Sequence, residues 1–289
     1  MFAWAPGGLY STTNTVGSVL ALLYVIGMIL LLWRKQAKAG EATVWPTWNP
    51  LHYFKKDERG KFNPVFFLLC YAAAYLLLMQ SLRWSSVLFS TYVGPGGGLR
   101  VSPAVQVAFA SGVLVFIPVF LLLARFFPGN GRATRQLELI FPAFALHHVF
   151  NRLACLFGGC CFGVPVRMFG IAYPQGSRAS ITYGVGTRLF PNLLIEIGVM
   201  LLLFAALVWL NHRGKRTLPI FPLVFGATGF LLGFVTSHTH ERLLEPMFGF
   251  TQPTPFTHLL VFFVGVAFLV LVMRERKRKP ATEPELEIE

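Results

Sequence analysis

The chain has 289 residues, of which 55% are hydrophobic and 13% charged, and its formal net charge is +13. This composition is too apolar for a soluble globular domain of that length. The positive charge is not spread as a nucleic-acid-binding surface would require, because the basic residues gather beside apolar stretches. We therefore expect a protein embedded in a membrane, with no nucleic-acid partner.

Seven apolar stretches are long enough to cross a bilayer. A membrane-spanning helix needs roughly 20 mostly apolar residues, because a rise of about 1.5 Å per residue must cover about 30 Å of hydrocarbon. In chain order the stretches lie near Thr15–Trp33, Pro64–Leu82, Pro103–Phe126, Leu137–Phe157, Pro191–Leu210, Pro219–Ser237 and Phe256–Met273. They predict an all-α fold, a polytopic membrane protein in which residues 1–273 form a single domain of about seven transmembrane helices.

The basic residues predict how these helices are oriented. Every lysine lies after the first, third, fifth or seventh stretch, and the intervening loops carry arginine as their only basic side chain. Because loops rich in lysine and arginine face the cytoplasm, the N-terminus is expected outside and the C-terminus in the cytoplasm. Met1–Val16 has no charged side chain, so the first stretch is expected to remain as a helix rather than to be cleaved as a signal peptide. The charged residues 274–289 are expected to form a disordered cytoplasmic tail.

Two outer loops are long enough to have structure of their own. Arg83–Ser102 ends in the glycine-rich run GPGGGLR, from Gly94 to Arg100, and Gly158–Phe190 contains glycine and proline throughout. Frequent turns are expected in the second of these loops.

The fourth stretch carries polar side chains where they are costly. His148, Arg152 and Cys155 lie at i, i+4 and i+7, which places them on one face of a helix. An ionisable side chain inside a membrane costs about 2.5–3.5 kcal/mol on insertion scales, so it needs a partner or a function. Arg152 is expected in the outer third of the helix, where its guanidinium could hold a phosphate in a bidentate manner. An arginine that is paired for packing alone is the plainer alternative.

Other titratable residues are expected near the same outer layer. Glu196, at the start of the fifth stretch, and Glu245, at i+3 from Arg242, are candidate partners of the two arginines. Two arginine–glutamate pairs in one layer favour a site for a phospholipid headgroup, although each glutamate could simply neutralise an arginine. His148 and His238 are candidate proton acceptors, since each precedes an arginine by one helical turn.

Three cysteines gather at the outer end of the fourth stretch: Cys155, Cys160 and Cys161. Adjacent cysteines such as Cys160 and Cys161 can bridge only in a strained ring, and the spacing lacks the ligand pairs of a zinc site. Small residues packed at a tight helix end are the plainer interpretation. No metal and no cofactor are expected.

The segment NRLACLFGGCCFGVP, from Asn151 to Pro165, resembles the signature of the prolipoprotein diacylglyceryl transferase family, which reads approximately GRIGNFINGELWGRP. It also resembles a cysteine-rich form of that signature, RxGCxxxGCCxGxP. The residues that align with the family are Arg152, Gly159, Phe162 in place of tryptophan, Gly163 and Pro165.

Three shorter segments agree with this family in the same order. Gly97–Gly98–Leu99 resembles its GGL, FPNLLIE ending at Glu196 resembles its HPTQLYE, and HERLLEP starting at His240 resembles its RFxxEF. The chain also departs from the family. Arg100, Val101, Ser102 and Pro103 replace the family's HGG and its essential histidine, Cys155 and Cys160 replace an asparagine and a glutamate, and Glu245 lies one residue closer to Arg242.

The resemblance implies a transferase of the bacterial inner membrane that moves a diacylglyceryl group from phosphatidylglycerol to an acceptor thiol or another nucleophile at the outer leaflet. A lipoprotein precursor is the family's acceptor, and glycerol phosphate is released. By this resemblance, Arg152 and Arg242 clamp the phosphate, and His148 or His238 replaces the missing histidine. The other implied substrate-binding residues are Glu196, Glu245, Gly97, Gly98, Cys155 and Cys160.

Two other functions stay open at this point. A protein that kept the fold after losing the histidine would bind or move phospholipid without catalysis. A membrane thiol–disulfide protein would use the three clustered cysteines, although the chain has no CxxC motif.

Overall fold

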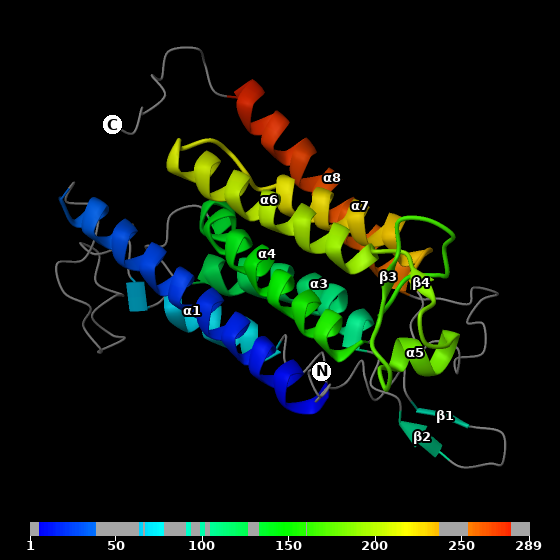
Figure 1. Cartoon of the computed structure of the whole chain (residues 1–289). Coiled ribbons are helices and arrows are strands. Elements are labelled where there is room, and N and C mark those ends of the chain that lie inside the picture. Colours follow the sequence, from blue (N-terminus) through cyan, green and yellow to red (C-terminus); the bar gives the residue numbers. More distant parts are fainter. Residues whose placement is uncertain are drawn as a thin grey trace.

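The computed structural model describes residues 6–38, 64–65, 67–77, 91–93, 99–101, 105–126, 133–159, 161–236 and 254–278. This part of the chain is predominantly helical (Figure 1). Its helices are α1 (Pro6–Lys38), a segment at Phe67–Leu77, α3 (Val105–Phe126), α4 (Ala133–Gly158), α5 (Arg178–Tyr183), α6 (Asn192–His212), α7 (Ile220–Gly233) and α8 (Thr254–Arg278). Its strands form two antiparallel pairs, β1 (Thr91–Val93) with β2 (Leu99–Val101) and β3 (Ile171–Ala172) with β4 (Arg188–Leu189).

Each of the seven predicted stretches contains a helix, so the helical prediction is confirmed. Four of these helices, α1, α4, α6 and α8, are long and apolar enough to cross a membrane. The apolar helices described in the other three stretches are shorter: Phe67–Leu77, Gly112–Ala124 within α3, and Ile220–Gly233. The chain is therefore a multi-pass membrane protein with four candidate spans in the described residues, and seven crossings remain a prediction.

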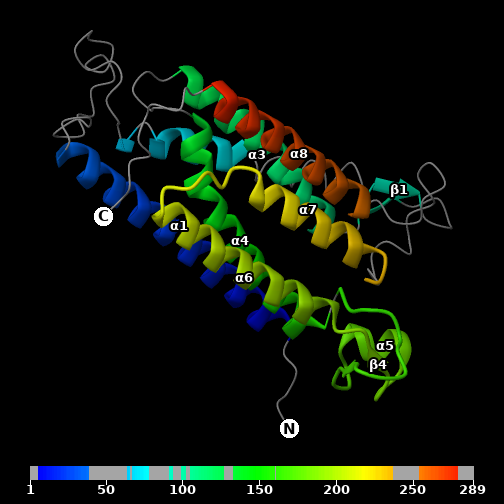
Figure 2. The same cartoon turned by 90° about the horizontal axis from the view of Figure 1, so that it is seen from above.

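Helix α4 lies at the centre of the bundle. It contacts α1, α3, α6 and α7, and Figures 1 and 2 show α1 and α6 running alongside it. In its apolar window 61% of the residues are buried, against 22–33% in the other three candidate spans, and its mean hydropathy is the lowest of the four. The candidate span with the lowest mean hydropathy thus takes the central place, where its polar side chains can find partners away from lipid.

Aromatic side chains fill the core around α4. Phe116 of α3 stacks on Phe120, with ring centroids 5.6 Å apart, and meets Phe144 of α4 edge to face at 4.8 Å. Phe141 of α4 stacks on Phe221 of α7 at 4.9 Å. Many leucines on the outside of the bundle are exposed, as expected where lipid rather than water surrounds a protein.

Four helices extend beyond their predicted bounds at the same end of the bundle. α1 ends at Lys38 rather than Trp33 and α6 at His212 rather than Leu210. α4 begins at Ala133 rather than Leu137, and α8 continues to Arg278 rather than ending at Met273. The start of the tail that was expected to be disordered is therefore helical. The added turns of α4 and α8 carry Arg135 and Glu275, which form ion pairs at this end.

The segment between α4 and α6, predicted as a turn-rich loop, folds into a small unit that we call the head (residues 161–190). It contains β3, α5 and β4, and its core is the fully buried Phe162 packed near Tyr173 and Tyr183. Backbone hydrogen bonds tie it to the bundle, because Ala179 N donates to Gly159 O at 3.2 Å and Val164 N donates to Val235 O at 3.0 Å. The head is thus fixed to the ends of α4 and α7.

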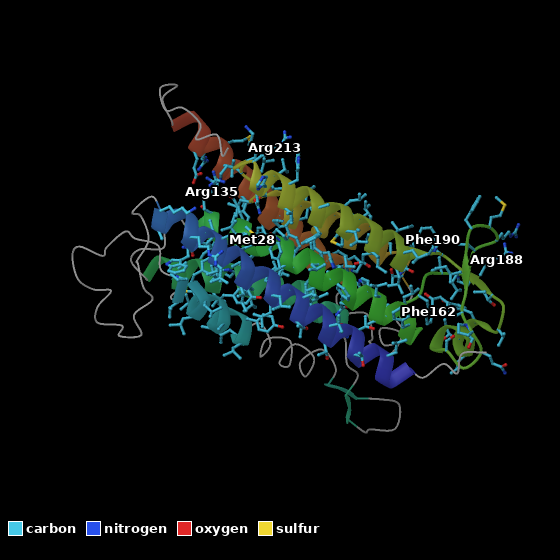
Figure 3. The ribbon with its side chains drawn as sticks, turned by 60° about the vertical axis from the view of Figure 1, so that its left-hand side comes forward. Met28, Arg135, Phe162, Arg188, Phe190 and Arg213 are labelled. Atoms are coloured by element: carbon cyan, nitrogen blue, oxygen red, sulfur yellow. The ribbon has the colours of Figure 1, made fainter. Side chains whose placement is uncertain are left out.

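Residues that the sequence assigns to opposite sides of the membrane lie at opposite ends of the bundle, and which end faces the cytoplasm remains a prediction. Figure 3 shows Arg135 and Arg213 at one end, and Phe162, Phe190 and Arg188 at the opposite end. The sequence assigns the first two residues to one side of the membrane and Arg188 to the other. We refer below to the end with Arg188 as the head end.

Candidate functional site

The most buried ionic contact at the head end joins α4 to α6. Arg152 Nε lies 2.7 Å from Glu196 Oε2, and His148 Nε2 lies 2.8 Å from Glu196 Oε1. His148 and Arg152 reach the same carboxylate because their i, i+4 spacing places them on one face of α4. All three side chains are almost completely buried. We call His148, Arg152 and Glu196 the Arg152 cluster.

The contacts of this cluster determine which nitrogen of His148 carries a proton. His148 Nε2 is 2.8 Å from Glu196 Oε1 and 3.2 Å from Arg152 Nε. One ring nitrogen cannot donate to the carboxylate and accept from the guanidinium at once. The shorter contact, with the charged carboxylate, identifies Nε2–H as a donor, and Arg152 Nε donates to the other carboxylate oxygen. In the neutral ring Nδ1 is then an acceptor, and this buried atom has no hydrogen-bond partner among the described residues.

Arg152 uses only part of its hydrogen-bonding capacity. Its contacts within the described chain are made through Nε, and the two terminal amino groups donate no hydrogen bond to a described residue. A guanidinium has five N–H donors, four of them on the terminal groups, in a planar arrangement that fits two oxygens of a phosphate or carboxylate. The cluster can therefore offer an anion a fixed, charged fork.

Aromatic rings enclose the His148 side of the cluster. The His148 ring lies 5.0 Å from Phe109 of α3 and 5.0 Å from Phe225 of α7. Phe225 in turn lies 5.0 Å from His258 of α8, whose ring rests on Gly229. A Cβ on Gly229 would come within 1.9 Å of that imidazole, so the contact requires glycine. Such apolar walls exclude water and strengthen the ionic contacts inside.

Asn192 connects the cluster to the head. It lies one helical turn before Glu196 on α6, and its Nδ2 donates to Cys161 O at 2.9 Å and to Thr236 Oγ1 at 2.8 Å. These two hydrogen bonds tie the start of the head and the end of α7 to the turn of α6 that carries Glu196.

The structure brings together some of the predicted site residues. His148, Arg152 and Glu196 meet directly, and Cys155 is buried on the same face of α4. The other predicted site residues lie outside the described residues: Gly97, Gly98, Cys160, His238, Arg242 and Glu245. The second arginine–glutamate pair therefore remains a prediction.

A second buried carboxylate lies at the opposite end of α4 and was not predicted as a centre of contacts. Glu138 Oε1 accepts from Arg216 Nε at 2.7 Å and from the backbone N–H of Leu218 at 3.2 Å. Its Oε2 accepts from Arg135 at 3.0 Å. The distribution of basic residues along the sequence explains both arginines simply as markers of topology. We call Arg135, Glu138, Arg216 and Glu275 the Glu138 cluster.

Arg216 uses all three of its guanidinium nitrogens within the chain. Nε donates to Glu138, Nη1 to Glu275, and Nη2 to Thr134 Oγ1 at 3.4 Å. These contacts join the start of α4, the segment between α6 and α7, and the end of α8. With no guanidinium nitrogen left over, this cluster acts as a brace between elements.

Comparison with known proteins supports the resemblance seen in the sequence. No known family profile matches the chain. It is 26% identical over 133 residues to phosphatidylglycerol–prolipoprotein diacylglyceryl transferase 2 of Clostridium perfringens, covering 45% of this chain and 48% of that protein. It is 22% identical over 153 residues to the phosphatidylglycerol–prolipoprotein diacylglyceryl transferase of Clostridium tetani, covering 52% and 57%.

The match covers only part of this chain and only part of each relative. The chain spans about half the length of the curated relatives it matches. The chain is thus distantly similar, over about half of its length, to prolipoprotein diacylglyceryl transferases.

Proposed function

We propose that this protein is a membrane transferase similar to prolipoprotein diacylglyceryl transferases. It would move a diacylglyceryl group from an anionic phospholipid, phosphatidylglycerol, to an acceptor thiol or another nucleophile at the outer leaflet. The observation that carries this proposal is the guanidinium of Arg152, which is buried, paired with Glu196 through Nε, and has two terminal amino groups uncommitted among the described residues.

The geometry of the Arg152 cluster suits a phosphate. Glu196 contacts the Nε edge of the guanidinium and fixes its orientation, while the opposite edge can hold two phosphate oxygens. The aromatic walls formed by Phe109 and Phe225 keep water away from His148 and strengthen the attraction between guanidinium and phosphate. Glu196 also neutralises Arg152 when no lipid is bound, which lowers the cost of placing the arginine inside a membrane.

The proposed chemical step is a substitution at carbon, in which negative charge develops on the departing phosphate oxygen. The sulfur of the acceptor attacks the diacylglyceryl carbon bonded to the phosphate oxygen, so a C–S bond forms as the C–O bond breaks. The electron pair leaves on glycerol phosphate, and Arg152 stabilises the charge that grows on the departing oxygen. The thiol proton passes to a base, and His148 Nδ1 is the acceptor that we propose because it has no partner among the described residues.

The remaining parts of this proposal come from the sequence and its resemblance. Arg242 with Glu245 would form a second phosphate clamp, and His238 is the alternative base. Gly97, Gly98, Cys155 and Cys160 complete the proposed lipid-binding residues. Seven crossings of the bacterial inner membrane, with the N-terminus outside and the C-terminus in the cytoplasm, would place the head end at the outer leaflet.

One sequence feature favours a second function, phospholipid binding without transfer. The residues from Arg100 to Pro103 replace the family's HGG, and with it the histidine that the family requires. A protein of this kind would keep the Arg152 cluster as a headgroup site and carry out no chemistry.

The two functions are separated by mass spectrometry of the purified protein in phosphatidylglycerol vesicles, incubated with a lipobox peptide that has one free cysteine. Transfer predicts that the peptide gains one diacylglyceryl group and that glycerol phosphate is released. The same peptide with serine in place of cysteine is the control for thiol attack. Phospholipid that stays bound and unchanged would favour the second function, and full turnover by Arg152→Ala would refute the role given to Arg152 in either one.

A further inference from the structure

A tight turn of the head exposes two large apolar side chains. The turn runs from Arg167 to Gly170, and between these residues Met168 is 69% exposed and Phe169 is 86% exposed. Phe169 is the most exposed large apolar side chain of the described residues. Water-exposed aromatic and methionine side chains of this kind commonly mark a surface that contacts a partner or a membrane.

The backbone holds this turn in a fixed and costly conformation. Phe169 has a φ of 53°, in the left-handed region that aromatic residues rarely adopt. Both ends of the turn are attached to β4, because Val166 N donates to Arg188 O at 2.9 Å and β3 pairs with β4 directly after Gly170. A Cβ on Gly170 would lie 2.6 Å from Arg188 Cβ, so the close packing beneath the turn requires glycine. The surrounding structure therefore keeps the Phe169 ring exposed at the tip.

The charged residues of the head are all positive. Arg167 belongs to the turn, and Arg188 lies on β4 directly below it; both are exposed. The whole stretch from Gly158 to Phe190 contains no aspartate or glutamate, and Arg178 adds a third positive charge. A partner surface with charge complementary to this part of the head would therefore be anionic.

The position of the head determines which anionic surface it can meet. The head joins the end of α4 to the start of α6, and both helices are candidate membrane spans, so it lies at a face of the bilayer. Figure 2 shows α5 and β4 beyond the end of α6, and Figure 1 shows β3 and β4 near that same end of α6. The head therefore lies where it can meet the headgroups of the lipid around the bundle.

We propose that the turn from Arg167 to Gly170 is a membrane anchor that binds anionic phospholipids of the leaflet at the head end. Phe169 and Met168 enter the leaflet just below the headgroups, and Arg167 and Arg188 bind lipid phosphates above them. Apolar side chains flanked by basic ones are typical of segments that lie in the membrane interface, where the arginine stems also contact lipid. The anchor fixes the head at the membrane surface, and it does not depend on the transferase activity proposed above.

The test is a photo-cross-linking experiment on the full-length protein in vesicles of phosphatidylglycerol and phosphatidylcholine. Phe169 is replaced by p-benzoylphenylalanine, and the irradiated protein is analysed by mass spectrometry for covalently attached lipid. Lipid adducts are expected at position 169. The control carries the same substitution at Gln175, an exposed residue in a polar turn of the head, where adducts should be rare. Equal lipid yields at the two positions, or adducts at 169 with another protein chain, would overturn the proposal.

The charge requirement is tested with the same probe. Combining Arg167→Gln and Arg188→Gln, or using vesicles of phosphatidylcholine alone, should lower the adduct yield at position 169 several-fold. Circular dichroism of the double variant should match that of the parent protein, because both arginine side chains are exposed. Yields that are unchanged under both conditions would refute the binding of anionic lipid.

Discussion

The two ends of α4 use the same pair of residue types for different purposes. At the end opposite the head, Arg216 is paired with the buried Glu138 and all three of its guanidinium nitrogens have partners within the chain. At the head end, Arg152 is paired with the buried Glu196 through Nε, and its terminal amino groups donate no hydrogen bond to a described residue. Burial and ion pairing are common to both ends, so the unused donors are the feature on which the proposed phospholipid site rests.

The two clusters also differ in whether their buried polar atoms have hydrogen-bond partners. A buried polar network stabilises a fold only when its members have partners, and each guanidinium nitrogen of Arg216 has one. In the Arg152 cluster, the buried acceptor His148 Nδ1 has no hydrogen-bond partner among the described residues. Incomplete satisfaction is expected where a ligand completes the network. The following changes test this contrast, from the largest expected effect to the smallest.

Removing Glu138 should destabilise the protein severely. Glu138→Ala leaves Arg216 and Arg135 without their shared carboxylate, and breaking a buried ion pair typically costs about 3–5 kcal/mol of unfolding free energy. Unfolding in mixed detergent micelles, followed by circular dichroism, measures the loss. A change below about 1 kcal/mol, the usual range for exposed pairs, would show that the Glu138 cluster is not a brace.

Arg152→Lys should abolish function while leaving the fold intact. Lysine retains the positive charge opposite Glu196 but lacks the planar fork that binds two oxygens. Loss of a donor that stabilises developing negative charge commonly lowers kcat by about 10²–10³-fold, and we expect a decrease of that size in phosphatidylglycerol turnover. Retention of the parental rate, measured as glycerol phosphate release, would contradict the proposed phosphate contact.

His148→Gln separates the structural and acid–base roles of His148. A glutamine amide can donate to Glu196 as Nε2 does, but it offers no counterpart to Nδ1. If Nδ1 accepts the thiol proton, turnover should fall by about 10²-fold, the lower end of the range for general bases, and its pH dependence should change. The matched control is His147→Gln, since His147 stacks on Phe109 and does not contact Glu196. Equal losses in both variants would argue against a proton acceptor at His148.

Arg135→Gln should have the smallest effect. The Arg135 side chain is 46% exposed, and Glu138 keeps its contacts with Arg216 and the backbone of Leu218 when Arg135 is replaced. Partly exposed ion pairs contribute about 0–1 kcal/mol, and we expect a loss within that range that shrinks further at high salt. A loss as large as that of Glu138→Ala would mean that Arg135 is an essential part of the brace.

Features that depend on residues close together in the chain could be predicted from the sequence. Runs of apolar residues predicted a helix in each of seven stretches, and the i, i+4, i+7 spacing predicted the shared face of His148, Arg152 and Cys155. The position of Glu196 near the outer start of its stretch made it a candidate partner of Arg152, and the structure shows that contact. Local periodicity is sufficient for such features because it depends only on helix geometry.

Features that depend on contacts distant in sequence could not be predicted. Glu138 meets Arg216 across 78 residues, and the pattern of basic residues explained Arg216 equally well by topology. The three-way contact of Asn192 with Cys161 and Thr236 depends on how the head packs against α7. The short strands of the head are likewise paired across a glycine-rich segment that gives no periodic signal.

The most direct test of the contrast between the two ends is one substitution made at each. Arg152→Lys and Arg216→Lys are purified under identical conditions, and the phosphatidylglycerol retained per folded protein is measured by quantitative mass spectrometry beside the stability of each variant. We predict that Arg152→Lys loses bound phosphatidylglycerol and stays stable, whereas Arg216→Lys loses stability and its folded fraction retains the lipid. Equal lipid retention by the two variants would contradict the assignment of the head-end cluster as the phospholipid site.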